Sequence, residues 1–148
     1  ADGTSAWTAQ DIAAPLVTDG QFVYAGGMAG QEVSALDAHT GSVRWQSRQF
    51  GLLDPLAQGC GTVIGTFPGT VQAFAAATGA QQWAITPAPN TFPVTAASVN
   101  GAAIIALPSL NSTSSIGVYD QRTGKARWVA TGNSMEDGTL PFAVGAFT

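Results

Sequence analysis

The chain has 148 residues, of which 45% are hydrophobic and only 9% are charged, and its net charge is −4. This length is enough for one domain with its own core, and five basic residues are too few for a surface that binds nucleic acid. The longest strongly apolar run, 102–107, is far too short to span a bilayer, so no membrane insertion by this segment is expected.

A tryptophan recurs along the chain at nearly constant spacing. Trp7 is followed by Trp45 after 38 residues, Trp83 follows after another 38, and Trp128 comes 45 residues later. Each of the last three tryptophans stands four residues after a Thr-Gly pair; the pairs are Thr40-Gly41, Thr78-Gly79 and Thr123-Gly124. A period near forty residues predicts an array of similar supersecondary units.

Each unit is expected to contain four short strands in a fixed order. The first begins near a proline, the second is an apolar run, the third ends just before the Thr-Gly turn, and the fourth carries the tryptophan. In chain order the prolines are Pro15, Pro55, Pro93 and Pro141, and the apolar runs are 22–25, 63–67 and 103–107. Four strands per unit of this length is the pattern of a β-propeller blade, so we predict an all-β fold of about thirteen or fourteen strands in four-stranded antiparallel sheets.

These landmarks also predict where the blades begin and end. Complete blades are expected at 13–50, 51–90 and 91–132, with a partial blade at 1–12 and another at 133–148. Propellers usually close with about four to eight blades, so the ring is expected to be incomplete in this chain. The remaining blades are then expected in the same polypeptide or in other chains.

The fold alone can explain why these residues recur in each repeat, without a ligand. Asp37 and Asp120 are expected to accept hydrogen bonds from turn N–H groups, and Ala75 replaces them in the middle repeat. The glycines are expected to supply the positive φ of a tight turn. The tryptophans are expected to be buried at equivalent positions, packed against the neighbouring blade with a hydrogen-bonded indole. Those tryptophans are Trp45, Trp83 and Trp128.

The pattern Ala-x-Asp-x-x-Thr-Gly-x-x-x-Trp resembles the repeat of pyrroloquinoline-quinone-type propellers, over roughly residues 4–147. That superfamily includes quinone-dependent alcohol and glucose dehydrogenases. It also includes a non-enzymatic branch, with the outer-membrane assembly lipoprotein BamB and the extracellular sensor domains of bacterial receptor kinases. The resemblance implies the fold and an extracytoplasmic location, whether periplasmic, in the cell envelope or secreted. It does not settle the function, because the repeat encodes blade packing.

The resemblance also implies what an enzyme of this kind would carry. Such an enzyme holds calcium with carboxylate and amide groups beside the quinone, uses an aspartate as base, and in some members has an adjacent cysteine pair. This chain has one cysteine, Cys60, which is expected to be a small buried hydrophobic residue. Its one histidine, His39, is expected in a solvated turn, too isolated for a zinc site. We therefore predict no catalytic, cofactor-binding or metal-binding residues and no enzymatic activity.

The third repeat is longer than the other two by seven residues, and the extra length is polar. It falls in the candidate binding loop, which consists of Pro108, Ser109, Leu110, Asn111, Ser112, Thr113, Ser114 and Ser115. Insertions on a rigid scaffold often carry recognition, although a passive, mobile insertion would have the same composition.

We interpret the chain as a non-catalytic module that binds a protein partner or senses an extracytoplasmic small ligand. The alternatives are a fragment of a quinone-dependent dehydrogenase and a scaffold in outer-membrane protein assembly.

Overall fold

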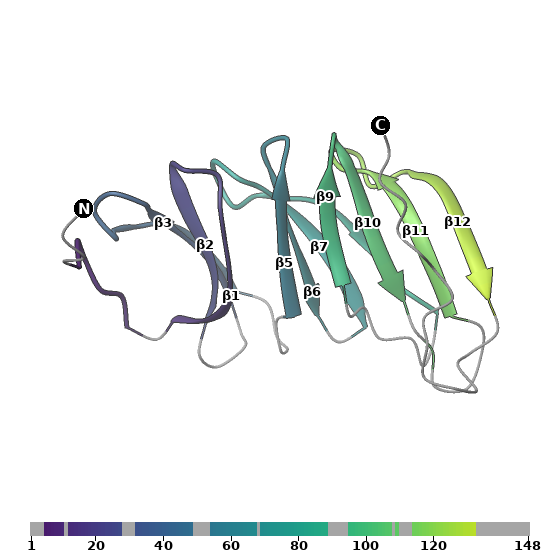
Figure 1. Cartoon of the computed structure of the whole chain (residues 1–148), viewed down its shortest axis with the longest axis horizontal. Coiled ribbons are helices and arrows are strands. Elements are labelled where there is room, and N and C mark those ends of the chain that lie inside the picture. Colours follow the sequence, from purple (N-terminus) through teal and green to yellow (C-terminus); the bar gives the residue numbers. More distant parts are fainter. Residues whose placement is uncertain are drawn as a thin grey trace.

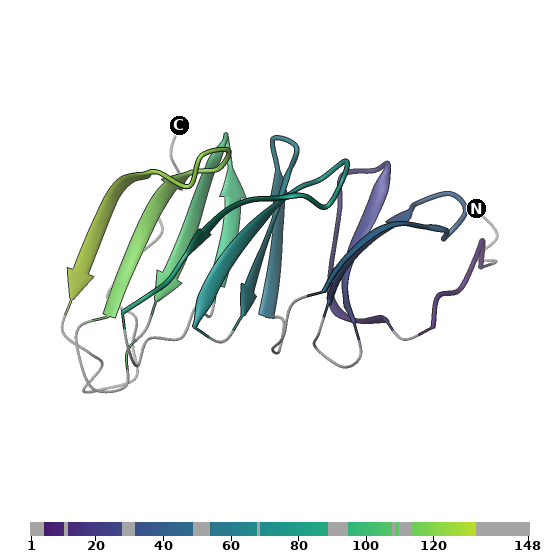
Figure 2. The same ribbon diagram turned by 180° about the vertical axis from the view of Figure 1, so that it is seen from behind.

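The computed structural model describes residues 5–10, 12–27, 32–48, 54–67, 69–88, 95–107, 109 and 114–132. Within these residues there are twelve strands and no helix. The strands form three four-stranded antiparallel sheets, which stand in a row (Figure 1). The predicted fold, a propeller segment of three four-stranded antiparallel blades, is therefore confirmed. Figure 2 shows the same row from behind.

Each sheet is one blade, and its strands follow one another in chain order from one edge to the other. Blade 1 contains β1 (Ile12–Thr18), β2 (Phe22–Gly27), β3 (Glu32–Asp37) and β4 (Val43–Arg48). Blade 2 contains β5 (Asp54–Gly59), β6 (Thr62–Phe67), β7 (Thr70–Ala75) and β8 (Gln81–Ile85). Blade 3 contains β9 (Thr95–Val99), β10 (Ala102–Leu107), β11 (Ser114–Asp120) and β12 (Ala126–Gly132). The first strands of the blades are neighbours, since β5 contacts both β1 and β9.

Two of the expected strands are not among these twelve. Residues 5–10 around Trp7 form no strand. A fourth strand of a blade needs a third strand to pair with, and the described residues hold no such strand before β1. The strand expected near Pro141 lies outside the described residues. The blade boundaries proposed above stay a prediction.

Neighbouring blades share apolar cores, and the middle blade contributes to both. Val63 packs toward blade 1, in a cluster with Tyr24 and Ala35. The next residue, Ile64, packs toward blade 3, in a cluster with Ala103 and Ile105. Successive side chains of a strand point to opposite faces, so every residue of β6 is buried. Burial alternates along β10, because only one face of blade 3 is covered.

A tryptophan on one blade is hydrogen-bonded to the turn of the next blade. In each case the indole N–H donates to the backbone carbonyl of the first residue after the third strand. The pairs are Trp7 with Ala38 (2.9 Å), Trp45 with Ala76 (2.7 Å) and Trp83 with Gln121 (2.8 Å). The contact therefore always runs from an earlier blade or segment to a later one, and we call it the indole–turn contact.

The Thr-Gly glycines form the other half of this contact. Gly41, Gly79 and Gly124 have φ of +70°, +71° and +68°. A Cβ on these residues would lie 2.5 to 2.8 Å from a ring carbon of the tryptophan that bonds to the same turn. Glycine is therefore required twice, by the backbone conformation and by the ring that lies on it.

The prediction that three tryptophans are equally buried is wrong for Trp128. All three occupy equivalent positions on the fourth strands, each opposite the equivalent position of the third strand, which is Ala35, Ala73 or Val118. Trp83 is only 9% exposed, whereas Trp128 is 46% exposed. Trp83 is covered by blade 3, and no further blade lies beyond blade 3 among the described residues.

The indole–turn contact predicts that two glycine substitutions with the same backbone penalty differ in cost. Gly61→Ala should lose about 1–2 kcal/mol of unfolding free energy, the cost of a left-handed conformation with a side chain. Its φ is +74° and its new Cβ would meet nothing within 4 Å. Gly79→Ala should lose about 1–3 kcal/mol more, because the Trp45 ring must move. Urea unfolding measures both losses, and equal losses would show that the ring contact contributes nothing.

Candidate functional site

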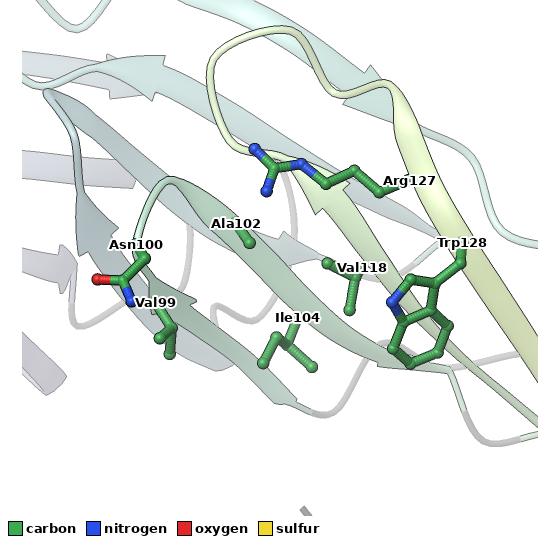
Figure 3. Close-up of a pocket in the computed structure, with 7 residues that line it drawn as sticks. All are labelled: Val99, Asn100, Ala102, Ile104, Val118, Arg127 and Trp128. Carbon is green, nitrogen blue, oxygen red and sulfur yellow. The ribbon is translucent and has the colours of Figure 1, made fainter. Parts of the chain in front are cut away.

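The outer face of blade 3 carries an apolar groove with a volume of about 250 Å³ (Figure 3). Its apolar lining comes from Val99, Ala102, Ile104, Val118 and Trp128, and its polar lining from Asn100 and Arg127. Val99 and Trp128 are 45% and 46% exposed. We call this surface the blade 3 groove.

In the other two blades, the face equivalent to the groove is buried against the next blade along the chain. Ile104 pairs with Val118 and Val118 pairs with Trp128 across the strands of blade 3. In blade 2 the same positions hold residues that are buried against blade 3, namely Ile64, Ala73 and Trp83. The groove is therefore a blade-to-blade surface whose second half is missing from the described residues.

The interface between blades 2 and 3 contains a buried polar contact that the sequence did not suggest. The side chain of Gln121 is fully buried. Its Nε2 donates to the carbonyl of Gly59 at 2.7 Å, and its Oε1 accepts from the Ser98 hydroxyl at 2.7 Å. A Cβ on Gly59 would collide with the Ser98 hydroxyl and the Gln121 amide. The other two blades have alanine at the position of Gln121, and this difference is the only feature of the sequence that could have indicated the contact.

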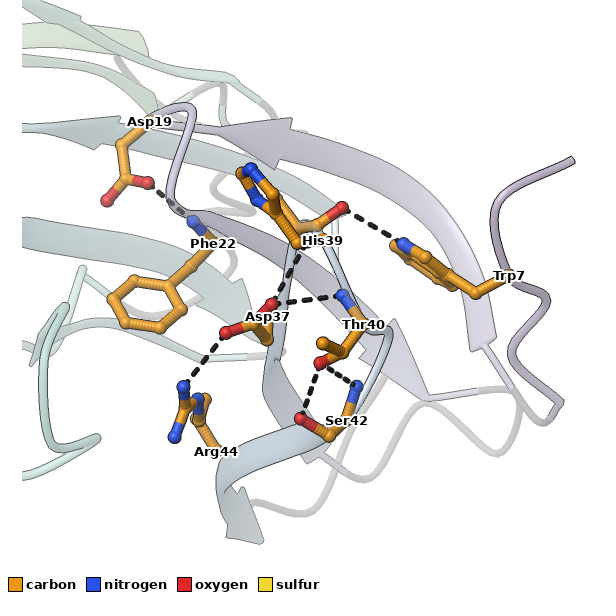
Figure 4. Close-up of polar contacts among 9 residues, drawn as sticks. Trp7, Asp19, Phe22, Asp37, His39, Thr40, Ser42 and Arg44 are labelled. Atoms are coloured by element: carbon orange, nitrogen blue, oxygen red, sulfur yellow. Dashed lines mark hydrogen bonds and ion pairs between the residues drawn. The ribbon is translucent and has the colours of Figure 1, made fainter. Parts of the chain in front are cut away.

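The turn after the third strand of blade 1 is organised by one carboxylate (Figure 4). Oδ1 of Asp37 accepts from the backbone N–H groups of His39 and Thr40, both at 3.0 Å. Oδ2 accepts from Arg44 at 2.9 Å. Asp120 does the same in blade 3, with the N–H and hydroxyl of Thr123 and with Arg127 at 3.0 Å; Arg127 also lines the groove.

Blade 2 replaces both members of this ion pair together. Ala75 stands in place of the aspartate and Gln82 in place of the arginine. The Gln82 amide oxygen instead accepts from the Thr62 hydroxyl at 3.0 Å. The arginines were missed by the sequence reasoning, although each stands seven residues after its aspartate.

The arginines make the two turn carboxylates strongly acidic. The bond from Arg44, followed by the N–H groups of Thr40 and His39, lowers the pKa of Asp37 from 3.8 to about 2. Arg127, followed by Thr123, lowers the pKa of Asp120 from 3.8 to about 2. Both aspartates are therefore ionised, paired groups rather than candidates for a general base.

The candidate binding loop is described only in part. Ser109 and Ser114 are buried, and the Ser109 N–H donates to the Ser114 hydroxyl at 3.2 Å. Ser114 and Ser115 are the first residues of β11, so they belong to the sheet. The other residues of this loop, Pro108 and 110–113, lie outside the described part of the chain.

Cys60 is exposed, so the expectation of a buried cysteine is wrong. It occupies the two-residue turn between β5 and β6 with φ of +47°. Among the residues that the structure describes, no group of three or more His, Cys, Asp or Glu side chains is placed to hold a metal ion. None of the described residues belongs to a helix long and apolar enough to cross a membrane.

Comparison with known proteins gives one family and several similar structures. The family model described as "Outer membrane protein assembly factor BamB" matches residues 1–144. The crystal structure of BamB from Moraxella catarrhalis aligns with a TM-score of 0.67 and 23% identity, over 83% of this chain and 39% of that chain. A europium-containing methanol dehydrogenase aligns with a TM-score of 0.68 and 20% identity, over 78% of this chain and 24% of that one.

A chain of similar length also aligns. The computationally designed Ika4 protein has a TM-score of 0.68 and 19% identity, over 91% of this chain and 92% of that chain. By contrast, the chain spans only about a quarter of the methanol dehydrogenase and about two fifths of the Moraxella protein. At these identities the likeness shows the fold. No curated protein matches the chain in sequence.

The turn ion pairs predict a loss of stability in acid. The folded pKa of Asp37 and Asp120 lies below the ordinary value of 3.8. Their contribution is therefore complete above pH 4 and is lost as the pH falls from about 4 to about 2. Arg44→Gln, the residue found in blade 2, should flatten this part of the curve of unfolding free energy against pH. Lys125→Gln makes the same charge change and should keep the wild-type slope. Identical slopes for all three proteins would contradict this role of Arg44.

Proposed function

The chain belongs to the family of the outer membrane protein assembly factor BamB, and on this basis we propose that it is part of a non-catalytic β-propeller of the cell envelope that binds a protein partner. The family and the fold support an extracytoplasmic scaffold more directly than a ligand sensor. Sensing of a small extracytoplasmic ligand remains the second form of the same proposal.

The match of the family model over residues 1–144 is the observation that carries this proposal, and the blade 3 groove is the candidate contact surface. A half-exposed tryptophan and an arginine are among its lining residues, and these two residue types are enriched among the residues that contribute most to binding at protein interfaces. The groove volume of about 250 Å³ is below the usual range of about 300–1,000 Å³ for small-molecule sites. An open, mostly apolar surface of this size fits a protein segment better than a small ligand.

The repeat residues support a non-catalytic role. The tryptophans and glycines hold the blades together, and both repeat aspartates are bonded to arginines. The likeness to a methanol dehydrogenase favours one alternative, that the chain is part of a quinone-dependent enzyme whose site lies elsewhere. We further propose that the candidate binding loop takes part in partner binding.

Partner binding through the groove predicts different effects for two adjacent residues of β12. Trp128 lines the groove, whereas Val129 is 49% exposed on the opposite face of the strand. With the purified chain as bait in a native envelope extract, Trp128→Glu should reduce captured protein about 10-fold or more, since an interface tryptophan often contributes about 2 kcal/mol or more. Val129→Glu should capture the wild-type amount. Equal capture by both variants would exclude the groove as the binding surface.

The enzymatic alternative is tested by titration calorimetry with pyrroloquinoline quinone and calcium. We expect no binding in the micromolar range, because the described carboxylates form no metal cluster and the two repeat aspartates are paired with arginines. Micromolar binding with a fixed stoichiometry would favour the dehydrogenase reading.

A further inference from the structure

The turn between β9 and β10 contains the one Asn-Gly pair of the sequence. Asn100 and Gly101 have φ of +47° and +74°, which is the two-residue type I′ turn that favours this pair. The other three asparagines of the chain are followed by threonine or serine. An asparagine side chain can react with the backbone nitrogen of the next residue, and glycine leaves that nitrogen open because it has no side chain to cover it.

Both groups of this reaction are free in the folded hairpin. Asn100 is exposed, and Figure 3 shows its amide at the tip of the hairpin. In the part of the chain that the structure describes, neither this amide nor the N–H of Gly101 makes a hydrogen bond. The similar pair Asp19-Gly20 in blade 1 differs, because its carboxylate accepts from two backbone N–H groups at 2.8 and 2.9 Å and from the Tyr24 hydroxyl at 2.7 Å.

The exposure of Asn100 does not depend on what lies beyond blade 3. Cys60 occupies the same turn position in blade 2, with the same φ of +47° and a glycine after it. Blade 3 covers blade 2, yet Cys60 is exposed. Gly20, in the corresponding turn of blade 1, is also exposed although blade 2 covers that blade. A neighbouring blade therefore leaves this turn accessible to water.

The same turn positions the residue that joins blades 2 and 3. The Gly101 carbonyl accepts from the Gln121 N–H at 3.0 Å and from the Arg127 guanidinium at 3.3 Å. The carbonyl of Gln121 in turn receives the Trp83 indole at 2.8 Å, and its side-chain amide donates to the Gly59 carbonyl at 2.7 Å. A change in the backbone of the turn therefore displaces a residue that holds both blades.

We propose that Asn100 is a site of spontaneous deamidation, and that its isoaspartate product weakens the contact between blades 2 and 3. The Gly101 backbone nitrogen gives its proton to solvent and bonds to Cγ of Asn100. The bond from Cγ to Nδ2 breaks, ammonia leaves, and a cyclic succinimide remains. Water then opens the ring at one of two carbonyl carbons. This inference goes beyond the proposed function and does not depend on it.

The two products of ring opening differ in their backbone. Cleavage between the Gly101 nitrogen and Cγ gives aspartate with a normal main chain. Cleavage between that nitrogen and the main-chain carbonyl carbon gives isoaspartate, in which the chain runs through the side chain and is one methylene longer. A two-residue type I′ turn requires a fixed backbone conformation at both positions, so the isoaspartate cannot keep the Gly101 carbonyl on Gln121.

Peptide mapping by mass spectrometry, after incubation of the folded chain, tests whether the site reacts. The peptide with Asn100 should gain the mass of an acid in place of an amide several times faster than peptides with the other asparagines. The rate should rise with pH, because the attacking nitrogen must lose its proton. Asn100→Gly keeps a residue suited to positive φ and should abolish the change. A site that reacts in urea but stays intact in the folded chain overturns the proposal.

Urea unfolding of the purified isoaspartate form tests the effect on the blades. Its midpoint should lie below that of the unmodified chain. Asn100→Asp has the same charge with a normal backbone and should unfold like the wild type. Gln121→Ala, which introduces the alanine found in the other two blades, should lose less on conversion to isoaspartate, because the bond to Gly59 is already absent. Equal midpoints for the modified and unmodified chains, or an equal loss in Gln121→Ala, would overturn the link to the blade contact.

Discussion

The contact between an indole and the turn of the next blade is the constraint on which the rest of the structure depends. A single hydrogen bond of about 2.8 Å and a ring lying on a glycine fix both the distance and the angle between two sheets. The faces of the sheets are mostly apolar, and apolar contacts have no preferred direction. A directional bond at one end of each interface removes that freedom, while the shared cores supply most of the attraction.

The sequence predicts this arrangement because the contact is local to each repeat. Trp45, its Thr-Gly pair and the apolar run before it recur at constant spacing, so the strands, their order and the antiparallel sheets follow from periodicity alone. The features that the sequence did not predict depend on contacts with the neighbouring blade. Trp83 and Trp128 are the same residue at the same position, yet their exposure differs fivefold because one has a blade beside it.

The candidate site was harder to predict for the same reason. Gln121 matters through its contact with Gly59, 62 residues away. The arginine partners of Asp37 and Asp120 lie only seven residues from these aspartates in sequence. The pairing is not evident from the repeat, because blade 2 has Ala75 in place of the aspartate and Gln82 in place of the arginine. The polar loop 108–115 is a candidate because of its length, whereas two of its described serines, Ser109 and Ser114, are buried and hydrogen-bonded to each other.

The one-way direction of the indole–turn contact has a consequence for how the protein is made. A ribosome synthesises each tryptophan before the turn that will receive it. Every finished blade therefore presents an indole donor and an apolar face to the nascent chain, and the next hairpin completes the contact as it emerges. We expect folding to proceed from the N-terminus as an ordered growth process, in which each blade serves as the template for its successor.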